Sequence, residues 1–306
     1  LNINITNNIF FINIYMNAKK KNKISVVIPS YNRVCFLSRA INSILNQSHQ
    51  VNEIILVDNG SNDGTVSFIK EKYKMVKVIY EKKKGVSYAR NTGIEKSKND
   101  WIAFLDSDDE WLPNKIKEQF DLLKKNKYNL NLIHTNEIWF KNGVFQNQKK
   151  KHEKKGGYIF ESCLNICKIS PSSVIIKKKT FNEYGLFDTK FKVCEDYELW
   201  LRLTSKFKVG YINTALIKKY AGHSDQLSKK YWGIDRYRIK ALEKIILKGN
   251  LSFDQKQMVL NTLLKKIDIV LLGAINRINH RVLRMYAKKK FLWRQYHYKY
   301  TKKKTY

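Results

Sequence analysis

Short apolar runs alternate with helical stretches along the first third of the chain. Four such runs predict buried strands, at residues 24–29, 53–57, 76–80 and 101–105. Between them, apolar residues recur at helical spacing, which predicts helices over 33–46, 66–73 and 86–97. Strands and helices that alternate through short connections are typical of an α/β fold with a mostly parallel sheet and flanking helices.

The pattern is less regular after residue 105. It predicts helices over 113–126, 178–184 and 196–204, and strands over 130–135, 137–140, 172–176 and 209–212. From residue 231 onward only basic helical stretches are indicated. We therefore expect an N-terminal tail (1–23), an α/β domain (24–228) and a basic helical extension (229–306). Because the first methionine is Met16, followed by a basic run, we expect residues 1–15 to be non-native or a frayed tail.

The charge of the chain is strongly positive, with 59 Lys and Arg against 26 Asp and Glu, a net +33. Half of this excess lies in residues 229–306, which favours an anionic partner such as nucleic acid or a membrane surface. The alternative is background composition on a solvated surface, since Lys, Asn and Ile share A/T-rich codons. Four cysteines indicate ordinary thiols in a reducing compartment, and no apolar run predicts a membrane span or a signal peptide.

Polar and acidic residues follow three of the predicted strands. Ligands of open parallel sheets bind beyond the carboxyl ends of the strands, so these residues are the candidates for a site. The pair Asp106-x-Asp108 is the most informative, because neighbouring carboxylates repel each other unless a cation intervenes. Mn²⁺ or Mg²⁺ carrying a diphosphate would suit them. The alternative is structural: Asp109 would cap a helix that begins near Pro113.

Seven blocks then occur in a recognisable order. They are VVIPSYNR (26–33), ILVDNGSNDGT (55–65), GVSYARNTGI (85–94), WIAFLDSDDEW (101–111), ISPSSVIIKK (169–178), FNEYGLFD (181–188) and CEDYELWLRL (194–203). Together they resemble the family 2 glycosyltransferases, inverting enzymes of the Rossmann-like GT-A fold that use nucleotide sugars. The resemblance covers about residues 24–228 and is specific for the family, not for the sugar.

The resemblance implies a donor site at the strand ends. Pro29 would contact substrate, and Tyr31 would lie against the nucleobase, with a core tyrosine as the alternative for Tyr31. Asp58 and Asn59 would also meet the nucleoside. The family usually has a second carboxylate where this chain has Asn59, so both uridine and thymidine donors stay open. Arg90 would approach the donor diphosphate; its alternative is a structural ion pair with Asp106 or Asp58.

The resemblance also implies the chemistry. Asp106 would hold the ribose or assist the metal, and Asp108 would ligate Mn²⁺ or Mg²⁺, with His223 as a further metal ligand. Of the pair Glu195-Asp196, Glu195 would contact substrate and Asp196 would be the general base, with a helix cap as the alternative.

The sequence thus predicts an inverting glycosyltransferase. Its donor would be a UDP- or dTDP-sugar and its acceptor a hydroxyl of a glycan or lipid-linked molecule, in surface polysaccharide or glycoconjugate synthesis. We expect a cytoplasmic protein, with attachment to the inner face of the cell membrane through the basic extension, and no nucleic-acid partner. The alternatives are a non-catalytic relative and a basic nucleic-acid-binding protein.

Overall fold

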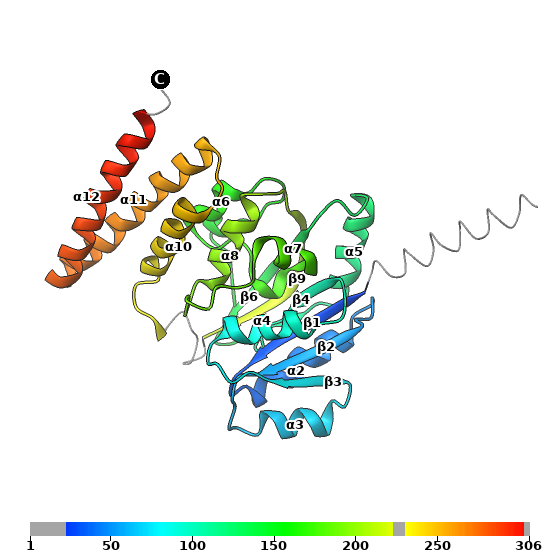
Figure 1. Ribbon diagram of the computed structural model, residues 1–306. Helices are drawn as coiled ribbons and strands as arrows, with labels where there is room; N and C mark the ends of the chain where they lie inside the picture. The colour runs from blue at the N-terminus through cyan, green and yellow to red at the C-terminus, as the bar shows by residue number, and fades with distance from the viewer. Residues whose placement is uncertain (1–22, 223–229, 303–306) are drawn as a thin grey trace, which may run out of the picture. The chain divides into compact units, whose positions relative to one another are not determined.

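The computed structural model describes residues 23–222 and 230–302 (Figure 1). Two compact units divide the chain. Among the described residues, the sheet unit comprises 23–147, 170–186 and 209–220, and the helical unit comprises 148–169, 187–208, 221–222 and 230–302. This division differs from the predicted boundary near residue 228.

One mixed sheet dominates the sheet unit. Its order within the described residues is β3-β2-β1-β4-β8-β6-β9-β5, with β7 added to β6. The neighbours β3, β2, β1 and β4 are parallel, and the pairs β4–β8, β8–β6, β6–β7 and β9–β5 are antiparallel. The strands are β1 (Ile24–Ser30), β2 (Glu53–Asp58), β3 (Val76–Tyr80), β4 (Trp101–Phe104), β5 (Glu110–Trp111), β6 (Leu132–Lys141), β7 (Val144–Gln146), β8 (Ile175–Lys177) and β9 (Gly210–Ala221).

Helices cover both faces of the parallel part. The helices of this unit are α2 (Val34–Leu45), α3 (Thr65–Lys72), α4 (Val86–Lys96), α5 (Lys115–Lys125) and α7 (Lys178–Tyr184), with the 3₁₀ turn η2 (Pro171–Ser173). Apolar residues of α2, α3 and α5 share one core cluster with Val26 and Ile28 of β1. On the other face, Gly93 of α4 lies so close to Val27 that a Cβ would come within 2.2 Å of that side chain.

The α/β class predicted from the sequence is confirmed. The first seven predicted elements match β1 to β4 and α2 to α4 within a residue or two. The two strands predicted over 130–140 form the single strand β6, and the predicted strand over 209–212 continues to Ala221 as β9. Pairing with neighbouring strands extends β9 through polar positions that an apolar pattern does not reveal.

The helical unit consists of η1 (Lys150–His152), α6 (Phe160–Asn165), α8 (Glu195–Thr204), α10 (Asp235–Lys248), α11 (Phe253–Asn276) and α12 (His280–Lys302). Helix α8 contacts α6 and α10, and α11 contacts α6, α10 and α12. Their apolar faces meet in a core that includes Trp200, Leu242, Leu263 and Ile267. Residues 187–208 therefore fold with the C-terminal helices. None of the described helices is both long and apolar enough to cross a lipid bilayer.

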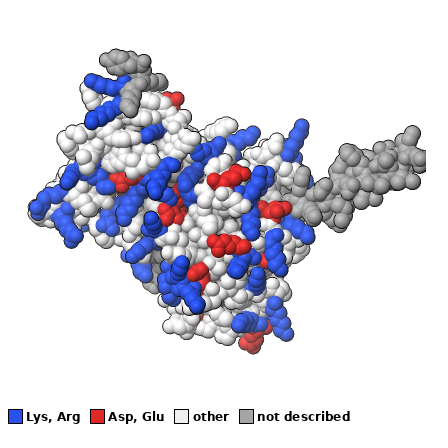
Figure 2. Space-filling view, in the orientation of Figure 1, with Lys and Arg blue, Asp and Glu red and all other residues white. Residues whose placement is uncertain are grey.

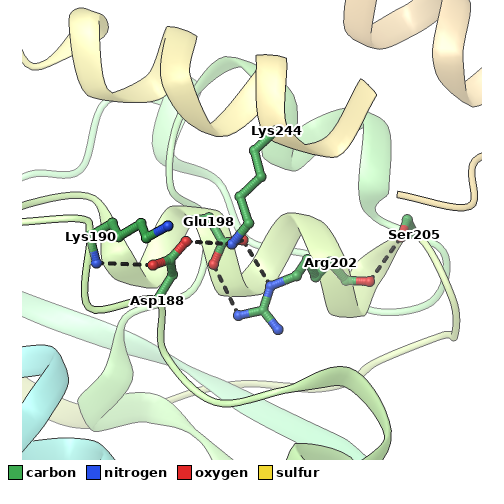
Figure 3. A network of polar contacts seen from close by, with 6 residues as sticks. All are labelled: Asp188, Lys190, Glu198, Arg202, Ser205 and Lys244. Carbon is green, nitrogen blue, oxygen red and sulfur yellow. Dashed lines mark hydrogen bonds and ion pairs between the residues drawn. The ribbon is translucent and has the colours of Figure 1, made fainter. Parts of the chain in front are cut away.

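A charged network ties α10 to α8 (Figure 3). Glu198 is 2% exposed and accepts from Lys244 at 2.7 Å and from Arg202 at 2.8 Å. Lys244 also contacts Asp188 at 2.6 Å, so a single ammonium joins two carboxylates. Arg202 therefore has a structural ion-pair role in this network.

Candidate active site

The turn after β2 is built around Asp58. Ser30 at the end of β1 pairs with Asp58, which is 2% exposed. Its carboxylate accepts from the backbone N–H groups of Gly60 at 3.1 Å and Ser61 at 3.2 Å. Asp58 thus fixes the turn that follows β2, at the carboxyl edge of the parallel strands.

Asn59 is turned toward the loop between β3 and α4. Its amide nitrogen donates to the carbonyls of Glu81 at 2.9 Å and Lys83 at 2.8 Å, and its amide oxygen accepts from Gly85 N–H at 2.7 Å. The residue is 6% exposed. The predicted contact with a nucleobase therefore needs correction, because these bonds give the Asn59 side chain a structural role in holding the 81–85 loop.

Tyr31 and Pro29 have opposite environments. Tyr31 is 53% exposed, and the ammonium of Lys84 lies 4.5 Å from its ring centroid. This excludes the core alternative and leaves an aromatic surface at the strand edge. Pro29 is buried within β1, where it pairs with Val57. The ring of Pro29 belongs to the interior of the sheet, and its predicted substrate contact stays a prediction.

The acidic loop, residues 106–109, follows β4. Asp106 forms an ion pair with Arg90 of α4 at 2.7 Å, and Arg90 is 3% exposed. Burial alone would raise the pKa of Asp106, but the charges of Arg90 and Lys219 lower it below its usual value. Asp106 is therefore ionised and held in place, and the structural pair foreseen for Arg90 is present.

Asp108 and Asp109 differ from Asp106 and from each other. Burial and the neighbouring charge of Asp106 raise the pKa of Asp108. Asp109 accepts from Ser172 Oγ at 2.6 Å and from Tyr220 N–H at 3.3 Å, and burial raises its pKa to about 8. Asp109 does not cap α5, whose N-cap residue is Asn114. Asp108 is thus the carboxylate of this loop that is left for a ligand.

Lys219 of β9 is a member of this site that the sequence reasoning missed. Burial alone would lower the pKa of Lys219, but the nearby carboxyl groups of Glu137 and of the acidic loop, Asp109 above all, raise it above its usual value. Arg39 donates to the Asp108 carbonyl at 2.5 Å. The sequence held a signal for this residue, because side chains two residues apart on a strand lie on the same face of the sheet. Lys219 therefore shares a face with Ile217, which is buried.

The residues present fit a divalent metal only in part. In the described ranges, no group of three or more His, Cys, Asp or Glu side chains is arranged to hold a metal ion. Mg²⁺ and Mn²⁺ are commonly bound by one or two carboxylates together with substrate phosphates. Asp108 meets that requirement, whereas the predicted ligand His223 lies outside the described residues.

Asp196 lies in the first turn of α8, in the helical unit. Its carboxylate accepts from Tyr197 N–H at 2.7 Å and from the thiol of Cys167 at 3.4 Å. Cys194 is the N-cap residue and no side chain caps the helix, so the capping alternative for Asp196 is wrong. Glu195 is 6% exposed, and Asp196 is the more accessible of the pair.

Cys167, one of the four cysteines that the sequence predicts to be ordinary thiols, contacts Asp196 in the structure. Burial and the nearby charge of Asp196 raise the pKa of Cys167 well above its usual value, so the thiol stays protonated. A protonated thiol can donate to the carboxylate, and the Ile169 carbonyl, 3.1 Å from the sulfur, competes for the same proton. The structure therefore brings Tyr31, Asp58, Arg90, Asp106 and Asp108 together in the sheet unit, and Glu195 and Asp196 in the helical unit.

Comparison with known proteins identifies the family. The model of glycosyl transferase family 2 matches residues 25–185, which is more than half of the chain. The chain belongs to glycosyltransferase family 2. The matched segment contains the turn of Asp58 and the acidic loop, so the family pattern coincides with the site in the sheet unit.

Individual relatives agree with this assignment. An uncharacterised glycosyltransferase of Rickettsia conorii is 34% identical over 204 residues, 64% of this chain and 32% of that protein. The Escherichia coli protein WfgD, a UDP-Glc:α-D-GlcNAc-diphosphoundecaprenol β-1,3-glucosyltransferase, is 28% identical over 69% of this chain and 84% of its own. The chain thus spans about a third of the Rickettsia relative's length.

Solved structures show the same fold. Residues 1–349 of S. aureus TarS in complex with UDP superpose with a TM-score of 0.61 and 19% identity, over 82% of this chain and 74% of that one. The same protein with UDP-GlcNAc superposes with a TM-score of 0.59 over 89% of this chain and 92% of its own. At this identity the likeness establishes the GT-A-like fold of the chain.

Proposed function

We propose that this protein is an inverting glycosyltransferase that moves a sugar from a UDP-sugar to a hydroxyl group of a glycan or lipid-linked acceptor. The observation that carries the proposal is the acidic loop at the end of β4, with Arg90, Lys219 and Arg39 around it. Cations beside the ionised Asp106, with the carboxyl group of Asp108 next to it, suit a nucleoside diphosphate and its metal. Family membership supplies the reaction class.

The donor is a UDP-sugar. WfgD is named for UDP-Glc, and TarS has been solved with UDP and UDP-GlcNAc. In this chain the exposed ring of Tyr31 offers a face for a base, beside the turn that Asp58 fixes. The side chain of Asn59 holds the 81–85 loop, so it is left out of this proposed base contact.

The reaction is a single displacement. The acceptor oxygen attacks the anomeric carbon as the bond to the donor diphosphate breaks, and Asp196 takes the acceptor's proton. The Tyr197 N–H and the Cys167 thiol hold the two oxygens of that carboxylate, which fixes its direction. Arg90 keeps Asp106 in place, and Lys219 adds positive charge near the departing diphosphate.

We propose that Mn²⁺ or Mg²⁺ binds at Asp108 together with the donor phosphates. Bound there, the ion stabilises negative charge on the leaving diphosphate. Burial and the charge of Asp106 raise the pKa of Asp108, so this carboxylate is one that a cation would stabilise. His223 remains a proposed further ligand.

The acceptor is proposed to be lipid-linked, as the name of WfgD indicates for that relative. The C-terminal helices support this: α12 carries eight Lys and Arg residues and no Asp or Glu. Figure 2 shows Lys and Arg side chains spread widely over the visible face. Basic residues attract anionic lipid headgroups, so the protein would work in the cytoplasm at the inner membrane surface.

The proposal is tested with full-length protein, Mn²⁺ and a panel of UDP-Glc, UDP-GlcNAc, UDP-Gal and dTDP-Glc. We expect one UDP-sugar to raise the melting temperature and to be turned over, and the released product to have inverted anomeric configuration by NMR. Thermal stabilisation without hydrolysis or transfer to any acceptor tested would instead identify a non-catalytic relative. Absence of both effects for every nucleotide sugar would overturn the proposal.

A further inference from the structure

A cavity of about 140 Å³ opens in the helical unit, beside the start of α10 and the turn between α11 and α12. It takes no part in the transfer mechanism. Its walls combine cationic, aromatic and aliphatic side chains, among them Trp232, Arg236, Ile269, Ala274, Arg277 and Val282. Such a mixed lining suits a ligand that is anionic at one end and apolar at the other.

Two guanidinium groups form the polar wall of this cavity. Arg236 stacks over Trp232, with 3.6 Å from the guanidinium carbon to the ring centroid, and its Nε is buried without a hydrogen-bond partner. Arg277 folds back over Gly273, where a Cβ would lie 2.5 Å from its terminal nitrogen. Arginine forks match the oxygens of phosphate groups, which makes phosphate the preferred anion.

The acidic residue of the same wall is already neutralised. Asp235 accepts from Arg238 at 3.0 Å and from Lys266 at 2.9 Å. These two cations lower the pKa of Asp235 against the effect of its burial, so it is ionised and paired. The positive charge of Arg236 and Arg277 is therefore left for a ligand.

An exposed aliphatic strip runs along the end of α11 and adjoins the cavity at Ile269, which is the member of the strip that lines it. Ile269, Leu272, Ile275 and Ile278 are 52%, 61%, 55% and 76% exposed, at intervals of three residues along the end of α11 and the following turn. A small soluble anion would leave this surface uncovered. A second copy of the chain is disfavoured as its cover, because the adjoining α12 carries only basic charges and would repel its own image.

We propose that this cavity binds the phosphate of an anionic phospholipid, with the acyl chains passing Ile269 onto the exposed aliphatic strip of α11. The turn between α11 and α12 then lies in the membrane interface, with its aliphatic side chains in the acyl region and its arginines at the headgroups. This inference deepens the proposed function, since it names the lipid contact through which the enzyme is held at the membrane.

Binding is measured by calorimetry on the full-length protein with dihexanoyl-phosphatidylglycerol below its micelle concentration. Dihexanoyl-phosphatidylcholine and inorganic phosphate are the comparison ligands. We compare Arg236→Gln/Arg277→Gln with the control Arg281→Gln/Arg284→Gln, which removes the same charge from exposed positions of α12 outside the cavity. We expect the cavity pair to weaken phosphatidylglycerol binding at least about tenfold and the control pair less than about threefold.

Equal losses in the two double variants would overturn the site, because they would reduce it to general surface charge. Inorganic phosphate binding as tightly as phosphatidylglycerol would overturn the lipid assignment and identify a free-anion site.

Since Arg277 is exposed, Arg277→Gln alone tests the site without a risk to folding. Turnover of the UDP-sugar with a soluble acceptor should be unchanged in these variants. If the wild type lacks turnover but binds the lipid, the proposed function fails and this inference stands.

Discussion

At the scale of single residues, the acidic loop shows how neighbouring carboxylates acquire different roles. Arg90 and Lys219 lower the pKa of Asp106, whereas burial raises the pKa of Asp109 to about 8. Asp108 lies between these two residues in the sequence, and no ion pair like that of Arg90 with Asp106 is seen for it among the described residues. The three aspartates of the acidic loop therefore differ in role: Asp106 is held by an ion pair, Asp109 is a buried structural group, and Asp108 is the candidate metal ligand.

The role of Asp108 can be tested with a matched pair of variants. We expect Asp108→Asn to lower Mn²⁺-dependent UDP affinity at least about tenfold, because the charged ligand is lost. Glu110→Gln removes the same charge two residues away, where the carboxylate contacts Lys218 and Tyr220. It should leave the affinity within about twofold. Calorimetry with and without Mn²⁺ checks this, and equal affinity in Asp108→Asn and wild type would place the metal elsewhere.

A substitution at Asp196 should change the transfer rate without changing the affinity for UDP. Asp196→Asn keeps the size of the side chain and its contact with the Tyr197 N–H, but an amide is a far poorer base. UDP affinity should stay within about twofold, while transfer falls by roughly 10²–10⁴, the usual scale for general base catalysis. Calorimetry and initial rates with the acceptor measure the two effects. Near-normal turnover would contradict the assignment and make Glu195 the next candidate.

At the scale of elements, α4 depends on a glycine to lie close to β1. Alanine at Gly93 would place its Cβ 2.2 Å from Val27 Cγ1, which a packed sheet cannot accommodate without movement. We expect Gly93→Ala to lower the free energy of unfolding by about 1–3 kcal/mol, despite the better helix propensity of alanine. In the control Gly273→Ala, the Cβ meets only the end of the Arg277 side chain, so stability should not fall. Urea denaturation of the two variants checks the difference, and equal stability would refute the close approach.

The α8–α10 junction depends on a buried carboxylate. Glu198 separates the cations of Arg202 and Lys244, and its loss leaves them facing each other. We expect Glu198→Gln to destabilise the protein by about 3 kcal/mol, the range for breaking a buried ion pair. Glu153→Gln removes a carboxylate that is 58% exposed and should cost under about 0.5 kcal/mol. Denaturation followed by tryptophan fluorescence compares them, and a loss of less than 1 kcal/mol for Glu198→Gln would show that the network is not structural.

At the scale of the whole molecule, the division into two units changes how the basic C-terminal region can be studied. Helices α10 and α11 share a core with α6 and α8, so they are not a separable extension. Truncation after Ser228 would remove Leu242, Leu263 and Ile267 from this core, which would expose the buried Leu199 and Trp200 of α8 and unfold the surroundings of Asp196. Membrane attachment must therefore be tested by substituting surface charges.

We expect the full-length protein to co-sediment with phosphatidylglycerol vesicles at low salt and to be released at high salt, because screening weakens contacts between charges. Replacing the exposed Lys288, Arg294 and Lys299 by Gln should weaken binding by roughly tenfold or more, at about 1 kcal/mol per basic residue near the surface. Phosphatidylcholine vesicles are the control. Full-length protein that stays in the supernatant with anionic vesicles at low salt would contradict membrane attachment.

The sequence by itself determined the α/β class, the strand ends that form the site and the family. These properties depend on local patterns: apolar runs for β1 to β4, helical spacing for α2 and α4, and motifs such as the acidic loop and Glu195-Asp196. Buried parallel strands need continuous apolar runs, so their sequence shows them directly. The placement of Asp106 beside Arg90 was among the alternatives that the sequence offered.

Only the tertiary structure decided which groups meet across long distances in the chain. Lys219 joins the acidic loop because β9 extends along the sheet, and Cys167 reaches Asp196 from a segment about thirty residues away. The inward amide of Asn59 and the burial of Pro29 depend on neighbouring loops and strands in the same way. The grouping of α8 with the C-terminal helices has the same origin. Residue identity specifies what a side chain can do, but its partners are set by packing among segments that no local pattern relates.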